Sequence, residues 1–208
     1  MAWHPSQKNL LLSGSTDGLI SIFDTDQADE EDAVQQVLNP RSAVHCSGFL
    51  ADDQAYVLST DEQFTIYGLN KTGTADDAAL PVAEFGDVRP QLDCMYVVRL
   101  VQNQSQPTML AHGHNAKQKL QLTTLKSPQY SFEGTIDLPG AHGEEVVRDV
   151  RFAHQTAVLT CGEDGHVRLW RIDSVNEDST RMDIDEAPKS TKKKSRKEKK
   201  QADRFAPY

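Results

Sequence analysis

The sequence predicts an all-β fold, built from a repeated unit of four short strands and followed by a disordered tail. Three observations lead to this prediction. A tight Asp-Gly turn followed by an aromatic residue occurs in residues 11–24 (LLSGSTDGLISIFD) and again in residues 158–171 (VLTCGEDGHVRLWR). Short apolar stretches recur at the spacing of about 8–12 residues that is typical of all-β domains. No stretch before residue 172 keeps the helical period of about 3.6 residues over three turns.

The two segments match position by position. Their Asp-Gly turns align, and Phe23 and Trp170 each lie six residues beyond the aspartate. A third copy, residues 56–69, has Asp61 and an aromatic residue at the same distance. The three aspartates are separated by 44 and then 103 residues. A unit of about 50 residues therefore predicts a further copy in the second gap, and residues 107–125 fit this place although the aspartate and the aromatic residue are missing.

Each unit also has one strand before its hairpin and one after it. The expected strands before the second, third and last hairpins are residues 43–49, 91–100 and 146–152. The expected strands after the first three hairpins are residues 33–39, 80–86 and 130–138. Only AWHP is available before the first hairpin, and no apolar piece follows the last one. The first and last units are therefore expected to be incomplete.

The geometry of a two-residue hairpin turn explains the repeated Asp-Gly pair. Gly adopts a positive φ at little cost, and Asp tolerates the left-handed region and can accept a hydrogen bond from its own backbone. Beyond the first turn, Phe23 lies on one face of the strand and Ile20 and Ile22 lie on the other. Apolar residues on both faces predict a sheet that is covered on both sides, as in a stack of sheets.

This unit resembles the WD40 repeat, in which each blade of a β-propeller is a four-stranded sheet. The last copy carries the resemblance best. Its AHGEEVVRDVRF is similar to the Gly-His opening and the innermost strand, and LTCGEDGHVRLW is similar to the hairpin that ends in Trp. WD40 repeats often contain a buried hydrogen-bonded set in which costly polar groups satisfy one another. The resemblance implies this set for His142, Thr160, Asp164 and Trp170.

In the first copy the resemblance implies only part of this set, namely Ser13 and Asp17, because Phe23 has no indole donor. The resemblance covers residues 1–172 and implies a partial WD40 propeller of about four blades, the first and last incomplete. At about 45 residues per repeat, a ring of seven blades would need roughly 300 residues. We therefore expect the C-terminal half of a larger propeller, either as a fragment or as a half that another chain completes. Residues 173–208 are expected to form a separate disordered tail.

The composition argues against several classes of protein. No run of 18 apolar residues is present, so no membrane span or membrane partner is expected, and the N-terminus does not resemble a secretory signal. Three widely spaced cysteines predict no disulfide framework, and without a Cys-x-x-Cys pair they predict no zinc site. The net charge is −9, and residues 173–208 contain ten Lys or Arg against eight Asp or Glu. Residues 1–172 thus carry −11, which is unsuited to wrapping nucleic acid.

Three groups of residues could still suggest chemistry. Cys161 and His166 lie across a hairpin and could form a nucleophile–base pair, but Cys161 matches the small residue that blades usually have there. His112 and His114 share a strand face, yet two histidines without a third ligand make a weak metal site. The acidic run at residues 26–33 is most simply a solvated loop, with a docking site for a basic partner as the alternative. We therefore predict no catalytic, metal or cofactor site, and a protein that is not an enzyme.

The tail turns from acidic to basic along its length. Residues 189–200 (KSTKKKSRKEKK) contain one acidic and eight basic residues, and the basic ones are Lys189, Lys192, Lys193, Lys194, Arg196, Lys197, Lys199 and Lys200. Such a run cannot bury enough apolar surface to fold alone. Runs of this kind are typical of nuclear import signals and of nucleic-acid patches. We expect recognition by an import receptor, with nucleolar retention, and keep direct RNA binding and a solvated tail as alternatives.

The sequence therefore predicts a non-enzymatic WD40 scaffold for protein–protein interaction. Its expected location is the nucleus, including the nucleolus, or both nucleus and cytoplasm. Rigid blades would present loops and strand ends to partner proteins whose identity the sequence does not give. The alternative is an RNA-associated factor of the ribosome-biogenesis kind, in which the basic tail contacts nucleic acid and the propeller positions it.

Overall fold

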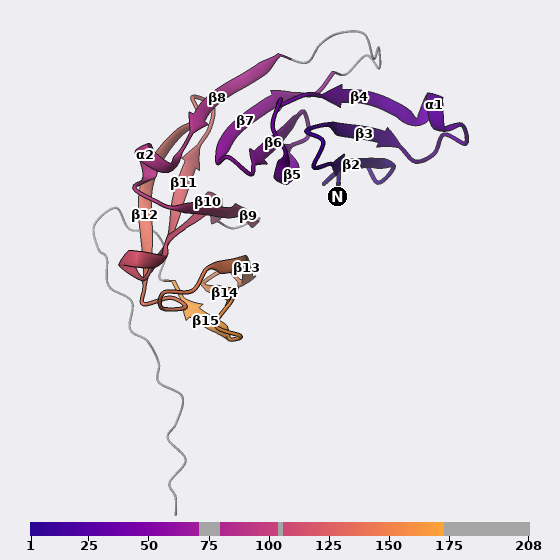
Figure 1. The fold of residues 1–208 in the computed structure, drawn as a ribbon. Coiled ribbons are helices and arrows are strands. Elements are labelled where there is room, and N and C mark those ends of the chain that lie inside the picture. Colours follow the sequence, from indigo (N-terminus) through magenta and orange to yellow (C-terminus); the bar gives the residue numbers. More distant parts are fainter. Residues whose placement is uncertain (71–79, 104–105, 173–208) are drawn as a thin grey trace, which may run out of the picture.

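The computed structural model describes residues 1–70, 80–103 and 106–172, which form four antiparallel sheets arranged in an arc (Figure 1). The predicted all-β class and partial propeller are confirmed. The expected tail, residues 173–208, lies outside the described residues. In the part of the chain that is described, no helix is long and apolar enough to span a lipid bilayer.

Each sheet is a meander in which consecutive strands pair antiparallel, and we number the sheets as blades 1 to 4 in chain order. Blade 1 contains β1 (Ala2–Trp3), β2 (Leu10–Gly14), β3 (Ile20–Asp24) and β4 (Val34–Leu38). Blade 2 contains β5 (Val44–Ala51), β6 (Gln54–Ser59), β7 (Gln63–Gly68) and β8 (Pro81–Asp87). Blade 3 contains β9 (Tyr96–Asn103), β10 (Gln106–His114), β11 (Lys119–Lys126) and β12 (Ser131–Pro139). Blade 4 contains β13 (Val147–His154), β14 (Ala157–Gly162) and β15 (Val167–Arg171).

The first strand of each blade lies on the concave side of the arc. Figure 1 shows β5, β9 and β13 on this inner side, while β4, β8 and β12 run along the outer side. Three short helical segments connect strands, namely α1 (Glu30–Ala33), α2 (Arg89–Leu92) and η1 (Asn115–Lys117). The inner strands of all four blades therefore face one common space.

Two boundaries differ from the sequence-based expectation. Blade 1 has four strands rather than a truncated set, although its first strand, β1, is only two residues long. The strand expected at residues 91–100 begins only at Tyr96, because α2 occupies residues 89–92 and ends at Asp93, whose φ of 49° is left-handed. Blade 4 has three strands within the described residues, as expected.

The Asp-Gly turns are wider than the expected two-residue turn, since the Gly18 and Gly165 amides donate to the carbonyl oxygens of Ser15 and Gly162, and the glycines but not the aspartates have a positive φ. Gly18 and Gly165 have positive φ values of 88° and 72°. In the first turn Asp17 Oδ1 accepts a hydrogen bond from the Leu19 amide at 2.9 Å. In the last turn Asp164 Oδ1 accepts one from the His166 amide at 3.1 Å. Both carboxylates thus stabilise their own turn.

Apolar layers separate successive blades. Between blades 1 and 2, Leu12, Ile20 and Ile22 of blade 1 lie in one cluster with Phe49 and Val57 of blade 2. Similar clusters join blades 2 and 3 and blades 3 and 4. Burying a side chain of this size contributes about 1.5–3 kcal/mol, so these layers are the main force that holds the arc together.

Candidate interaction site

The last blade holds the four side chains of the expected hydrogen-bonded set close together. His142 lies in the loop before β13, and Thr160 and Trp170 lie on β14 and β15. His142 Nδ1 is 2.7 Å from Asp164 Oδ1, and His142 Nε2 is 2.8 Å from Thr160 Oγ1. Trp170 Nε1 donates to Thr160 Oγ1 at 2.9 Å. His142 and Thr160 are each 1% exposed, so these bonds replace the water that both groups lose.

The donors and acceptors of this set determine the direction of each of its hydrogen bonds. An ionised carboxylate only accepts hydrogen bonds, so His142 Nδ1 donates to Asp164. His142 Nε2 then accepts from the Thr160 hydroxyl, whose oxygen accepts from the indole of Trp170. A neutral imidazole satisfies every member of this chain, which assigns the tautomer with the proton on Nδ1.

Asp164 is held by the set as a structural carboxylate. The hydrogen bond from His142 lowers the pKa of Asp164, and the His166 amide and the Arg168 charge act in the same direction. Arg168 Nη2 donates to Asp164 Oδ2 at 2.8 Å, while Oδ1 serves His142 and the His166 amide. Both oxygens are therefore engaged in holding the turn and the loop before β13, and neither is free to take a proton from a substrate.

Gly162 is a part of this arrangement that the sequence analysis missed. A Cβ at Gly162 would lie 2.7 Å from His142 Nδ1 and 3.0 Å from the Val146 carbonyl oxygen. Only glycine leaves room for the imidazole at this distance. The signal in the sequence is the Gly that precedes Glu163 in LTCGEDG, but without the position of His142 its role could not be assigned.

The corresponding positions of blade 1 do not form such a set. Asp17 bonds within its own turn, and among the described contacts none joins Ser13 to Asp17. Blade 2 has a simpler link, in which Ser42 Oγ donates to Asp61 Oδ2 at 2.6 Å. Each of these turns is thus anchored differently, although all three carry the repeated aspartate.

Blade 3 contains a buried polar group that the sequence did not predict. His112 Nε2 lies 2.9 Å from Thr123 Oγ1, which lies 2.9 Å from Thr135 Oγ1. His112 is 1% exposed, and burial, with the nearby charge of Lys119, lowers its pKa from 6.5 to about 4. The imidazole is therefore neutral and packed inside the blade. Over residues 1–70, 80–103 and 106–172 no group of three His, Cys, Asp or Glu side chains is placed to hold a metal ion.

Cys161 and His166 are not brought together as a nucleophile and a base. Cys161 lies on β14 opposite Val167. His166 Nδ1 is 2.7 Å from the carbonyl oxygen of Asp164, so its ring nitrogen faces its own turn. In the described structure the three cysteines are free thiols.

The concave side of the arc contains an open hollow of about 750 Å³ between the innermost strands. Trp3 of β1, Phe49 of β5, Arg99 of β9 and Phe152 of β13 all line it. The walls thus combine aromatic side chains with a guanidinium group. This mixture suits a ligand that has both apolar and polar groups, and a surface of this kind is typical of protein recognition.

Hydrogen bonds between blades hold the walls of this hollow in place. Arg99 Nη1 of blade 3 donates to Asp149 Oδ1 of blade 4 at 2.8 Å. Partial burial acts to raise the pKa of Asp149, but the bond and charge of Arg99 outweigh it and lower the pKa. Gln102 Nε2 donates to the Leu50 carbonyl oxygen of blade 2 at 3.0 Å. The site is therefore shaped by rigid neighbours rather than by a single loop.

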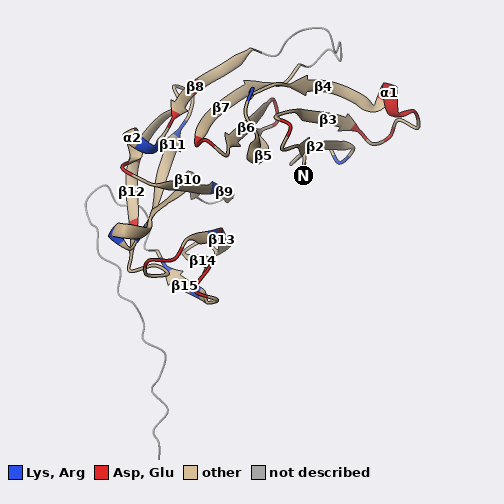
Figure 2. Cartoon of the chain, in the orientation of Figure 1, with Lys and Arg blue, Asp and Glu red and all other residues tan. Residues whose placement is uncertain are grey.

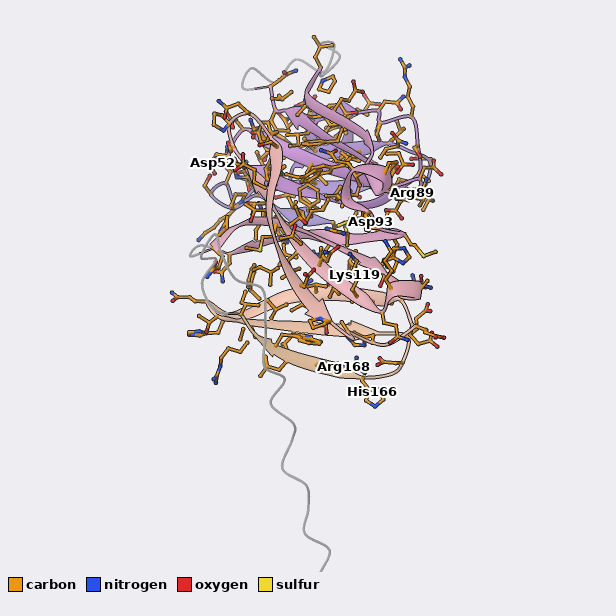
Figure 3. The ribbon with its side chains drawn as sticks, turned by 90° about the vertical axis from the view of Figure 1, so that its left-hand side faces the viewer. Asp52, Arg89, Asp93, Lys119, His166 and Arg168 are labelled. Atoms are coloured by element: carbon orange, nitrogen blue, oxygen red, sulfur yellow. The ribbon has the colours of Figure 1, made fainter. Side chains whose placement is uncertain are left out.

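Charged side chains gather on the two rims of the blades. Figure 3 shows Asp93, Lys119 and His166 toward one rim and Asp52 toward the opposite rim. Lys117 Nζ donates to Asp93 Oδ1 at 2.7 Å on the first of these rims. Figure 2 shows α1 as an acidic segment at one end of the arc, where its acidic residues are exposed. Exposed pairs of this kind contribute little to stability, so the rim charges are not the main supports of the fold.

Comparison with known families identifies the repeat. The WD domain, G-beta repeat family matches residues 1–24 and 128–171, which contain β1 to β3 and β12 to β15. The first and last copies are thus the ones that carry the family pattern most clearly, as the aligned turns suggested.

Three curated relatives are similar over longer stretches. An uncharacterized WD repeat-containing protein of Saccharomyces cerevisiae is 40% identical over 172 residues, which cover 81% of this chain and 42% of the relative. Another from Schizosaccharomyces pombe is 31% identical over 186 residues, covering 83% of this chain and 54% of the relative. The chain therefore spans about half the length of these two relatives.

The third relative agrees with a narrower resemblance. The order of the first hairpin, the acidic loop, a divergent blade and the final GEDG…LW is similar to WD repeat-containing protein 89. The WD repeat-containing protein 89 homolog of Dictyostelium discoideum is 36% identical over 97 residues, covering 45% of this chain and 25% of that protein.

A solved structure shows the same fold. The β-propeller domain of Cps50 (Swd1) from Myceliophteria thermophila superimposes with a TM-score of 0.57 at 11% identity. The match covers 84% of this chain and 51% of that one. At this identity the likeness concerns the fold alone, and it shows an arc that corresponds to half of a propeller.

Proposed function

We propose that this chain, which belongs to the WD40 repeat family, acts as a protein-interaction scaffold and not as an enzyme. The hollow between the innermost strands is the observation that carries the proposal. It is open, it is about 750 Å³ in volume, and rigid strands of all four blades line it. A set of residues that resembles catalytic machinery, His142 with Asp164 and Thr160, is instead engaged in hydrogen bonds within blade 4.

The side chains of the hollow indicate what a partner must offer. Trp3 is 59% exposed and provides an apolar surface for an aromatic or aliphatic side chain. Arg151, whose side chain is 70% exposed, lines the same hollow and provides a positive charge. We infer that the partner inserts a protein segment that carries apolar and acidic side chains, because exposed aromatic and arginine side chains are the usual anchors of interfaces.

Site-specific photo-crosslinking tests this proposal. A photoreactive amino acid is placed at Gln102 in the hollow and, as a matched control, at Lys126 on β11, outside the hollow. We expect discrete protein adducts from Gln102 in cells. The yield of adducts from Lys126 should be lower. Arg151→Glu should reduce the Gln102 adducts about tenfold, whereas Arg148→Glu on the same strand, outside the hollow, should leave them unchanged. Equal labelling at both positions would contradict the proposal.

We further propose that the scaffold works in the nucleus. The support is the basic run at residues 189–200, whose eight positive charges have the composition that import receptors bind. The second candidate function uses the same run to contact RNA, with the propeller as a positioning element. The run supports both functions, so they need a separating experiment.

Deletion of residues 189–200 separates the two functions. If the run is an import signal, the deletion abolishes nuclear accumulation while RNA crosslinking stays at its original level. If it binds RNA, crosslinking is lost even when a foreign import signal restores the protein to the nucleus. RNA binding would also weaken with salt, with a log–log slope of at most about −6 for eight charges on a single strand.

A further inference from the structure

The charge of the hollow is opposite in sign to that of the blades as a whole. Residues 1–172 carry a net charge of −11, yet in the described part of the chain the charged side chains that line the hollow are Arg99 and Arg151. Asp149 Oδ1 accepts a hydrogen bond from Arg99 Nη1 at 2.8 Å, and Asp149 Oδ2 accepts a longer one from Arg151 Nε at 3.4 Å. Because one carboxylate cannot neutralise two guanidinium groups, the hollow keeps a positive charge and attracts an acidic segment.

Apolar side chains also line the hollow. Trp3 is exposed there, and Leu50 and Phe152 are half-buried. The volume of about 750 Å³ is in the range of pockets that enclose small ligands, so it suits a few residues rather than a folded element. A protein segment that fills the hollow therefore needs apolar and acidic side chains within a few positions of one another.

The chain itself contains such a segment. Residues 182–186 (MDIDE) carry two apolar and three acidic side chains within five positions. If these residues bind in an extended conformation, the two apolar side chains lie on one face and two of the acids lie on the other. The run at residues 189–200 has eight basic residues, which the arginines of the hollow would repel. Residues 182–186 thus offer both kinds of side chain that the hollow accommodates.

The segment is connected to a point near the hollow. Ile172 is 1% exposed, and its amide donates to the Thr156 carbonyl oxygen at 2.8 Å. Thr156 follows Phe152 of the hollow by four residues, which span at most about 14 Å. Ten residues lead from Ile172 to Met182, and they can span about 35 Å. Residues 182–186 can therefore reach the hollow, where a connection of this length gives an effective concentration on the order of 1 mM.

We propose that residues 182–186 of this chain bind in the hollow and compete there with the partner protein. The inference rests on the proposed function, because it assigns an occupant to the same site. The segment acts as an internal ligand that is weak in itself but always present at a high effective concentration. A partner must bind more tightly than this segment in order to displace it, so the contact sets a threshold for recognition.

Photo-crosslinking within the purified full chain tests the contact. A photoreactive amino acid at Gln102 should form an adduct with residues 182–189, which trypsin releases as one peptide because Arg181 precedes it and Lys189 ends it. The matched position Lys126, outside the hollow, should give at least about tenfold less of this adduct. In a mixture of isotope-labelled and unlabelled chains, both crosslinked peptides should come from the same chain. Adducts between labelled and unlabelled chains, or equal yields from the two positions, overturn the proposal.

Neutral variants then test whether the acids of the segment make the contact. Asp183→Asn with Asp185→Asn should lower the yield of the internal adduct from Gln102 about tenfold. The matched control, Glu177→Gln with Asp178→Asn, removes the same charge outside the segment and should change the yield less than about twofold. Arg151→Glu should lower the yield in the original chain, and by a smaller factor once the two acids are neutral. Equal losses from the two neutral pairs overturn the proposal.

The same probe in cells separates this inference from the proposed function. Deletion of residues 182–186 should raise the yield of partner adducts from Gln102 at least about threefold, because the internal competitor is removed. Partner adducts that the deletion leaves unchanged, with no adduct to residues 182–189, would overturn the inference while the proposed function stands. An internal adduct in the absence of any partner adduct would support the internal contact and overturn the proposed function.

Discussion

Blades 1 and 4 contain nearly the same hairpin, yet they hold its aspartate in different ways. Asp17 accepts a bond from its own turn alone. Asp164 makes the same turn bond and is also bound by His142 and Arg168. The repeated aspartate therefore builds the turn wherever it occurs, but it links the hairpin to the preceding loop only where the partners from other segments are present.

The difference also shows how the polar side chains of blade 4 are engaged. Thr160 and Trp170 complete a chain of hydrogen bonds that engages both ring nitrogens of His142. In blade 1 the corresponding residues are Ser13 and Phe23, and the indole donor is missing. The set in blade 4 is thus an internal support that one blade of this arc has in full.

The largest effect on stability is expected at Gly162, where the imidazole of His142 packs closely against the backbone. Gly162→Val would place side-chain atoms against His142 and the Val146 carbonyl, and so force the imidazole away from both of its partners. We expect a loss of about 4 kcal/mol in the free energy of unfolding, from overpacking together with lost hydrogen bonds. Urea unfolding followed by tryptophan fluorescence measures it.

The control for this change is in blade 1. Ser15 takes the place of Gly162 in the first hairpin and is exposed, so Ser15→Val should cost less than about 1 kcal/mol. Equal losses at the two positions would show that the close approach of His142 is not the cause.

The pH dependence of the free energy of unfolding should show the contribution of the buried imidazole of blade 3, His112. Between pH 6.5 and about 4 the unfolded chain binds a proton at His112 that the folded chain does not bind. Stability therefore falls as the pH is lowered through this range, by at most about 3 kcal/mol from this group. Wild type and His112→Gln should diverge in their pH dependence below pH 6.5. Parallel curves would mean that His112 titrates normally.

Removal of the Thr160 hydroxyl, at the centre of the set, should have the next largest effect on stability. Thr160→Val keeps the shape but leaves His142 Nε2 and Trp170 Nε1 buried without their shared partner. We expect a loss of about 2 kcal/mol. Ser13→Ala in blade 1 is the comparison, and it should cost only a few tenths of a kcal/mol. A Thr160→Val protein as stable as wild type would indicate that water replaces the hydroxyl.

The smallest effect is expected from making blade 4 resemble blade 1. Trp170→Phe removes the indole donor while it keeps an aromatic ring, as at Phe23. The loss of one hydrogen bond should cost about 1 kcal/mol, together with a small loss of packing. Thermal unfolding can measure it, and a loss above about 3 kcal/mol would show that packing of the larger ring dominates.

The sequence predicted the repeated parts of this molecule better than the contacts between them. The Asp-Gly turns and the aromatic residue six positions later were visible because they recur, and the apolar residues on both strand faces predicted stacked sheets. Local departures from the repeat were harder to predict. Pro90 lies in the first turn of α2, and Asp93 caps its end in a left-handed conformation, so part of a segment with an apolar pattern forms a helix before the strand.

The missed polar contacts have a common physical cause. Ser42 with Asp61, and His112 with Thr123, join residues of different segments, and neither pair repeats elsewhere in the chain. Gly162 is similar, since its role depends on where a loop 20 residues earlier places His142. Such contacts follow from the packing of blades and cannot be obtained from spacing along one strand.

The set around His142 is expected to support the fold, whereas recognition is expected to take place in the hollow. Photo-crosslinking from Gln102 in a Thr160→Val background, at a temperature where the variant is folded, tests both parts together. We expect a lower unfolding temperature and the same pattern of crosslinked proteins as in the wild-type chain. A folded Thr160→Val protein that loses these crosslinks would contradict it, because the set would then take part in recognition itself.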